Sequence, residues 1–359
     1  MSCRAVLIKY GFIIALTGTA FLCDKNPVEP DPSSVPYAIY LLDDPEFDPE
    51  KVFNEDYSDF EIKGHPWLTD EDIEFYDWSN HCIFLKENKL TLFPKYDFKY
   101  FVEEFINKMF IVAVNGEICY PAQCNYNAFS PIPELGLIGI FLTPDDVLWI
   151  EWYYPFAWDR RNDVRVKQVL IEKGLFHAGL EVHLDELDAI TIIENADTST
   201  IEYTFTLSNK DEDNLYVFDP DIVGNSFHWY TNGPVFIRVG ESGLYESTYK
   251  ELDPREDWNP SWYVKLESGA SLTRTVSLKG YPYFPPGEYA VRFPHSGPRV
   301  YKDLRYTEDG RYWTGGDVLS NYSFVYIDEN GEQTVARRLL SVADQDFLRA
   351  QKPLEHSVK

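Results

Sequence analysis

Apolar and polar residues alternate along parts of the first half of the chain, as expected of strands that bury one face. Residues 35–42 alternate in this way and predict a first strand, and residues 77–85 and 146–154 are also predicted to be strands. The sharpest local signal is a pair of strands at 109–114 and 117–120. The Asn115-Gly116 pair between them supplies the two positive-φ residues of a type I′ turn, so we expect a β-hairpin.

Two helical signals interrupt these strands. Thr69 and Asp72 have capping-box spacing, which predicts a short helical turn. Asn162 can cap a helix that runs to Lys173 and ends at Gly174, since glycine readily takes the left-handed conformation. Residues 35–187 are therefore predicted to form an α+β domain of unknown function.

The second half of the chain has a different pattern. Residues 189–193 and 200–207 are rich in β-branched side chains. Turn signals then recur about every ten residues: Asn209-Lys-Asp, Asp219-Pro-Asp, Asn232-Gly-Pro, Ser268-Gly and Pro286-Gly. Short strands with regular turns predict a β-sandwich over 188–330, followed by a polar C-terminal extension over 331–359. The predicted fold class is mainly β with some α.

Three motifs in this half carry a resemblance to a known module. They are Tyr203-Thr-Phe-Thr-Leu-Ser-Asn209, the stretch 266–278 with Gly269, and Pro286-Gly287-Glu-Tyr289 leading to Phe293. Residues 201–293 resemble the immunoglobulin-like (Ig-like) module of intracellular proteinase inhibitors and of the non-catalytic domain of deuterolysin-type metallopeptidases. The resemblance implies an Ig-like sandwich. Independently of the resemblance, Tyr289 is a candidate tyrosine-corner residue.

The N-terminus has the profile of an export signal. Arg4 and Lys9 precede an apolar stretch over residues 10–22, which at about 13 residues is short for a membrane-spanning helix. We interpret residues 1–23 as a signal peptide and the polar, Pro-rich residues 24–34 as a tether.

Two processing sites compete within this signal. Gly18-Thr19-Ala20 is a small-x-small site for cleavage before Phe21. Residues 20–23 instead resemble a bacterial lipobox with Cys23 as the lipidated residue, although Leu22 departs from its pattern. The tether favours Cys23, so we expect a bacterial cell-envelope or surface protein held by a lipid anchor. A secreted or periplasmic protein is the alternative.

The charge of the chain limits the kinds of partner that it can bind. It has 32 Lys+Arg against 59 Asp+Glu, a net charge of −27, so it offers no basic surface for nucleic acid. The same charge opposes electrostatic docking on anionic lipid, so we expect membrane contact only through a lipid anchor. Aromatic residues make up 16% of the chain, which favours β structure.

Two interpretations of the cysteine pair in the first half of the chain are open. Cys119 and Cys124 are close in sequence, and an oxidising compartment permits a disulfide between them. The alternative is two unpaired thiols packed as small hydrophobic residues.

Two groups of polar residues could bind a metal. Asp211, Asp213, Asp219 and Asp221 are weak candidates for Ca²⁺, which takes 6–8 oxygen ligands, and a hydrophilic turn explains the same residues. His177 and His183 with Asp185 also offer metal ligands, but their spacing favours two surface histidines on a connection between domains. No other cofactor is expected.

Aromatic residues in the second half suggest a recognition surface. Such side chains can stack on sugar rings or anchor a protein partner, although packing roles are commoner. The candidates are Trp229, Tyr230, Trp258 and Trp262.

No catalytic motif appears in the chain. The HExxH, GxSxG, GxxxxGK[ST] and GxGxxG patterns are absent. We therefore expect a non-catalytic envelope lipoprotein with a binding or structural role, whose partner is an envelope protein or polysaccharide. A proteinase inhibitor or protease-associated protein is the first alternative, and an extracellular hydrolase is the second.

Overall fold

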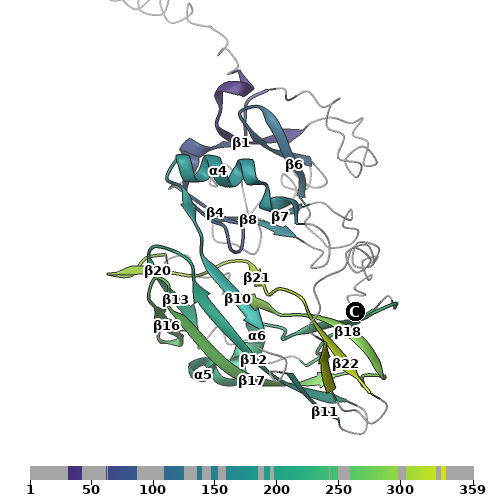
Figure 1. Ribbon diagram of the computed structural model, residues 1–359. Coiled ribbons are helices and arrows are strands. Elements are labelled where there is room, and N and C mark those ends of the chain that lie inside the picture. Colours follow the sequence, from purple (N-terminus) through teal and green to yellow (C-terminus); the bar gives the residue numbers. More distant parts are fainter. Residues whose placement is uncertain are drawn as a thin grey trace, which may run out of the picture.

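The structure, a computed structural model, describes part of the chain, and its strands and helices confirm a mainly β protein. The described residues are 31–42, 62, 64–86, 109–124, 136–139, 147–152, 159–184, 190–194, 198–241, 243–249, 259–297, 305–328 and 333–336. Among them, 51% are in strands and 15% in helices, so the few helices only supplement the sheets. Figure 1 shows two units, one above the other.

The N-terminal unit is built on a nine-stranded sheet. Its spatial order is β2-β1-β5-β6-β7-β8-β4-β3-β9. The strands are β1 (Tyr37–Leu42), β2 (Leu68–Thr69), β3 (Ile73–Asp77), β4 (Cys82–Leu85), β5 (Met109–Val114), β6 (Glu117–Cys124), β7 (Gly136–Gly139), β8 (Val147–Trp152) and β9 (Phe176–His177). Helix α4 (Val164–Glu172) buries Val166, Val169 and Leu170 in the core of this unit.

Of three local predictions in this unit, the structure confirms the hairpin and the capping box and corrects the helix cap. The β5–β6 hairpin turns at Asn115 and Gly116, with φ of 50° and 79°, as a type I′ turn requires. Thr69 and Asp72 form the predicted capping box on the 3₁₀ helix η2 (Asp70–Asp72). The cap of α4 is Asp163 rather than Asn162, because η4 (Arg160–Asn162) precedes it.

The strand predicted over 77–85 is wrong. Residues 73–77 and 82–85 form two antiparallel strands, β3 and β4, with a tight turn between them. The side chain of Asp77 accepts hydrogen bonds from Ser79, and His81 has a positive φ of 54°, so the chain reverses instead of continuing.

The C-terminal unit contains several smaller sheets. The four-stranded sheet is formed by β10 (Leu180–Leu184), β11 (Ile190–Glu194), β12 (Ser199–Asn209) and β17 (Ser271–Tyr281). The five-stranded sheet has the order β15 (Leu244–Tyr245), β14 (Val235–Arg238), β18 (Gly287–Arg292), β22 (Ser323–Ile327) and β23 (Gln333–Ala336). The others are β16 (Tyr263–Leu266), β13 (Asn214–Phe218) and β20 (Gly310–Tyr312), and the pair β19 (Pro294–Ser296) and β21 (Asp317–Leu319).

In the described part of the chain, these sheets enclose a large hydrophobic core, in the manner of a β-sandwich, and a small separate cluster contains Ala290 and Phe324. Strand β12 alternates along its length, with Ile201, Tyr203, Phe205 and Leu207 all fully buried. On its opposite face, hydroxyls of β12 and β17 pair across the strands, as in Thr204–Thr275 at 2.8 Å. Short helices α5 (Pro220–Val223) and α6 (Phe227–Tyr230) cover part of the core.

Tyr289 lies in this core and makes the contact that the sequence predicted for a tyrosine corner. Its ring is fully buried, and its hydroxyl donates to the carbonyl of Pro285 at 2.5 Å, four residues upstream. This is the geometry of a tyrosine corner.

The boundary between the two units lies earlier in the sequence than the predicted one. Strand β10, placed by the sequence in the first domain, pairs with β12 and buries Leu180 and Val182 in the second core. Strand β23 pairs with β22, so residues 333–336 belong to the five-stranded sheet and not to a polar extension. Within the described residues, no helix is long and apolar enough to cross a membrane.

Candidate functional site

A network of charged and polar side chains lies where the two units meet. It begins at the turn between β3 and β4, where Asp77 Oδ1 accepts the backbone N–H of Ser79 at 3.0 Å and its hydroxyl at 2.5 Å. Ser79 Oγ in turn accepts the indole N–H of Trp313 at 3.0 Å. The reversal that splits the predicted strand therefore places Asp77 against the second unit.

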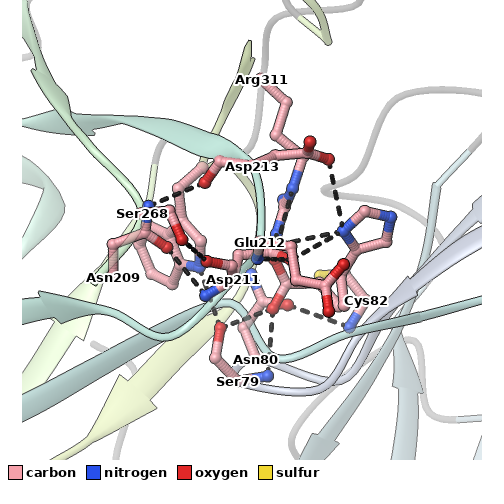
Figure 2. Close-up of polar contacts among 12 residues, drawn as sticks. Ser79, Asn80, Cys82, Asn209, Asp211, Glu212, Asp213, Ser268 and Arg311 are labelled. Atoms are coloured by element: carbon pink, nitrogen blue, oxygen red, sulfur yellow. Dashed lines mark hydrogen bonds and ion pairs between the residues drawn. The ribbon is translucent and has the colours of Figure 1, made fainter. Parts of the chain in front are cut away.

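Arg311 of β20 is the centre of the network (Figure 2). Its Nη2 lies 2.8 Å from Asp77 Oδ2 and 2.6 Å from Asp211 Oδ2, and its Nε lies 3.2 Å from the same Asp211 oxygen. The guanidinium also stands over the ring of Phe75, 5.2 Å from its centroid. One cation thus joins carboxylates from both units.

The Asp77 contact is an ion pair rather than a well-directed hydrogen bond. Asp77 Oδ2 and Arg311 Nη1 have no hydrogen-bond partner within the described part of the chain. The side chains of Arg311 and Asp77 are 2% and 1% exposed, so their charges interact with little screening by water.

Asp211 is held in place by the turn that follows β12. Its N–H donates to Asn209 Oδ1 at 2.9 Å, and its carbonyl accepts the Ser268 hydroxyl at 2.6 Å. His177 Nδ1 lies 3.0 Å from one oxygen of the Asp211 carboxylate and 3.1 Å from the other. Burial opposes the charge on Asp211, but the His177 hydrogen bond and the Arg311 cation outweigh it and lower the pKa of this carboxyl to about 2.

A second set of contacts flanks the ion pairs. Asn80 Nδ2 donates to the carbonyls of Thr314 and Gly315, at 3.0 and 3.3 Å. Trp149 Nε1 donates to the carbonyl of Asn80 at 3.0 Å. A Cβ on Gly316 would lie 2.5 Å from Trp149 Nε1, so this close approach needs glycine.

A third group of contacts lies at the edge of this network. Glu74 on β3 accepts the hydroxyl of Tyr306 at 2.6 Å and pairs with Arg305. The Arg305 guanidinium stands over the ring of Phe84, 5.3 Å from its centroid. The segment 305–316 therefore belongs to the second unit in sequence but is fastened to the first.

This arrangement is suited to holding two units together. The carboxylates of Asp77 and Asp211 pair with Arg311, and the Ser79 hydroxyl donates to the Asp77 carboxylate, which is already engaged by that cation. The side chain of His177 is 23% exposed, so it reaches the surface. We call Asp77, Ser79, Asn80, His177, Asp211 and Arg311 the interdomain joint.

The sequence did not single out Asp77, Asn80 or Arg311. Asp77 with Ser79 two residues later is a turn signal that was available in the sequence. The buried position of Arg311 had no local signal, because its partners come from distant segments.

The four calcium candidates do not converge. Asp211 and Asp213 lie beside His177, at 3.0 and 3.9 Å from its Nδ1. Asp219 and Asp221 instead pair with Arg274, at 2.7 and 2.9 Å. Among the residues that the structure describes, no group of three or more His, Cys, Asp or Glu side chains could hold a metal ion. His177 and His183 are likewise separate: His177 belongs to the joint, and His183 lies 3.1 Å from Glu181.

The disulfide between Cys119 and Cys124 is not formed. Both residues lie in the single extended strand β6, and five residues of strand span about 16 Å, beyond the 7 Å that a disulfide allows between Cα atoms. Cys119 is a buried free thiol, and burial raises its pKa to about 12.

Of the aromatic candidates, Trp262 is the one whose side chain is described. It is half-buried and packs edge-on against Phe218, with ring centroids 5.9 Å apart. Trp229 and Tyr230 lie in α6, but their side chains are outside the described set, as are all of Trp258 and Cys23.

Comparisons with known proteins assign no family to this chain. No family model and no curated protein matches the chain. A solved structure described as "X-ray structure of Northeast Structural Genomics Consortium target SoR45" aligns over 44% of this chain and 80% of its own, with 12% identity and a TM-score of 0.18. A likeness of that size carries no assignment of fold or function.

Proposed function

We propose that this chain is a non-catalytic lipoprotein of the bacterial cell envelope, attached through Cys23, with a binding or structural role. The interdomain joint is the observation that carries the proposal. Arg311 bridges Asp77 of the first unit and Asp211 of the second at 2.8 and 2.6 Å, which favours a stiff two-unit body. A stiff body on a tether is suited to presenting a surface at a fixed distance from a membrane.

Other buried or partly buried charges support a structural role. Arg161 is paired with Asp159 at 2.7 Å and donates to the carbonyl of Ile150. Arg274 holds Asp219 through two hydrogen bonds of 2.8 and 2.7 Å. Each of these charges is engaged with a partner that fixes a loop or a helix end, rather than poised beside a nucleophile.

A proteinase inhibitor or protease-associated protein is the second candidate. The tyrosine corner at Tyr289 and the turn at Gly269, with φ of 74°, fit the Ig-like module that the sequence resembles. Inhibition of one protease in a panel by the purified chain would favour this candidate, and unchanged rates throughout the panel would remove it.

Membrane fractionation tests the main proposal. We expect the wild-type chain to sediment with membranes and Cys23→Ala to move to the soluble fraction, because several acyl chains hold a protein stably. Cys3→Ala is the matched control, since Cys3 leaves with the signal peptide, and it should remain with the membranes. Equal retention of Cys23→Ala would overturn the proposed anchor.

A further inference from the structure

Helix α4 exposes apolar side chains on the face that points away from its own sheet. Val164 is 72% exposed and Ile171 is 54% exposed, and they are two of the six exposed large apolar residues in the described part of the chain. They are seven residues apart, which is two helical turns, so they share one face with the exposed Gln168 between them.

This face lies close to the place where the tether joins the fold. The 3₁₀ helix η1 (Pro32–Ser34) touches the β5–β6 turn so closely that a Cβ on Gly116 would lie 3.0 Å from the Ser33 nitrogen. The next residues of the hairpin hold the first turn of α4, since Arg165 Nη2 donates to the carbonyl of Ile118 at 3.2 Å. Figure 1 shows α4 in the same upper part of the molecule as β1 and β6.

The length of the tether limits how far this region can lie from a lipid on Cys23. Asp31, the first described residue, comes eight positions after Cys23. A fully extended chain of that length spans at most about 29 Å. The end of the N-terminal unit that carries η1 and the hairpin therefore stays near the membrane surface.

The charge around α4 opposes a phospholipid surface less than the rest of the chain does. Residues 160–173 contain five cations and two anions, in a chain whose net charge is −27. Ion pairs join Arg161 to Asp159, Arg165 to Glu117 and Lys173 to Asp70, and these three carboxylates bring the surroundings of the helix close to neutral. Anionic headgroups therefore repel this stretch less than the acidic remainder of the chain.

We propose that the outer face of α4, formed by Val164, Gln168 and Ile171, rests on the headgroup layer of the membrane that holds the Cys23 anchor. The inference rests on the proposed function, because two apolar side chains bind a bilayer only weakly by themselves. The anchor supplies the high local concentration that makes so small a contact effective. The result is a fixed orientation of the N-terminal unit on the membrane.

Lipid photo-cross-linking tests this orientation on the full lipidated chain. The protein is reconstituted into phosphatidylethanolamine and phosphatidylglycerol vesicles that contain a phosphatidylethanolamine with a diazirine on its headgroup. Vesicle flotation is measured first, and lipid adducts are then mapped by peptide mass spectrometry. We expect several-fold more adducts on the peptide carrying α4 than on the one carrying α5, whose Ile222 is 48% exposed in the C-terminal unit.

Matched variants separate this contact from attachment. Val164→Ser with Ile171→Ser should float as the wild type does but lose most of the α4 adducts, whereas Ile222→Ser should keep them. A floated protein with equal labelling of α4 and α5, or with none on α4, would overturn the inference and leave the anchor intact. A chain that does not float would overturn the proposed attachment and this contact with it.

Discussion

His295 is fully buried in an aromatic cluster, and neither of its ring nitrogens has a hydrogen-bond partner among the described residues. Its ring stacks on Trp313 with centroids 5.5 Å apart and lies 5.8 Å from Phe205. Burial lowers its pKa from 6.5 to about 3. Burial also lowers the pKa of His81 to about 3. The folded protein therefore keeps both rings neutral.

This burial makes stability depend on pH in a defined direction. An unfolded chain binds a proton at His295 near pH 6.5 and the folded chain only near pH 3, so the free energy of unfolding decreases as the pH falls through that window. The slope is about 1.4 kcal/mol per pH unit for each such histidine. We expect His295→Leu to lower the slope by that amount in urea unfolding between pH 6 and 4.

A measurement above the titration range serves as the control for His295→Leu. At pH 7.5 the histidine is neutral in both states, so any difference from wild type there reports packing alone. An unchanged slope in the variant would mean that His295 takes up its proton without unfolding.

Gly179 connects the two units at a point where no side chain fits. Its φ is +73°, and a Cβ would lie 2.2 Å from Asp77 Oδ1 and 2.3 Å from Ser79 Oγ. Gly174 has a φ of +67° with nothing within 4 Å, so alanine there is strained only in its backbone. We expect Gly174→Ala to cost about 1 kcal/mol and Gly179→Ala about 3 kcal/mol or more in chemical denaturation. Equal costs would contradict the close approach at the joint.

The β5–β6 hairpin is the part of the N-terminal sheet whose geometry the local sequence specifies most sharply. Gly116→Val places a β-branched residue at a φ of +79° and drives its Cβ towards Pro32 and Ser33 of η1. We expect a loss of about 1–3 kcal/mol, seen as a lower melting temperature. Asn115→Gly keeps a residue that tolerates positive φ and should change little. An unchanged melting temperature for Gly116→Val would mean that the turn does not constrain the sheet.

Elements of this kind could be predicted because neighbouring residues decide them. The Asn115-Gly116 turn, the Thr69 capping box and the Tyr289 corner each depend on side chains within a few positions. The joint could not be predicted in the same way. Asp77 and Arg311 are far apart in the sequence, and only the packing of the two units brings them together.

Arg311 is the side chain on which the coupling of the two units depends. Arg311→Met leaves the buried carboxylates of Asp77 and Asp211 without their cation, which should cost about 3–5 kcal/mol. We expect the units to uncouple, so that calorimetry shows two transitions where the wild type shows one. Arg305→Met, at the rim of the same interface, is the control and should keep a single transition. A single, unshifted transition in Arg311→Met would show that the joint contributes no coupling.

The extent of the C-terminal unit gives a last prediction. Strand β10 pairs with β12 from Leu180–Asn209 to Leu184–Phe205, and its Leu180 and Val182 are each 2% exposed. A fragment of residues 179–336 keeps this strand together with β23, and it retains Asp211 as a partner for Arg311. We expect it to give a β-rich circular dichroism spectrum and one cooperative melt.

A fragment of residues 189–330 is the matched comparison, because it lacks both β10 and β23. It loses the burial of Leu180 and Val182, which is about 1.5–3 kcal/mol for each side chain, and it leaves β12 and β22 with uncovered edges. We therefore expect it to melt at a lower temperature or to aggregate. Equal stability of the two fragments would place the start of the unit after β10, because Leu180 and Val182 would then contribute nothing to its core.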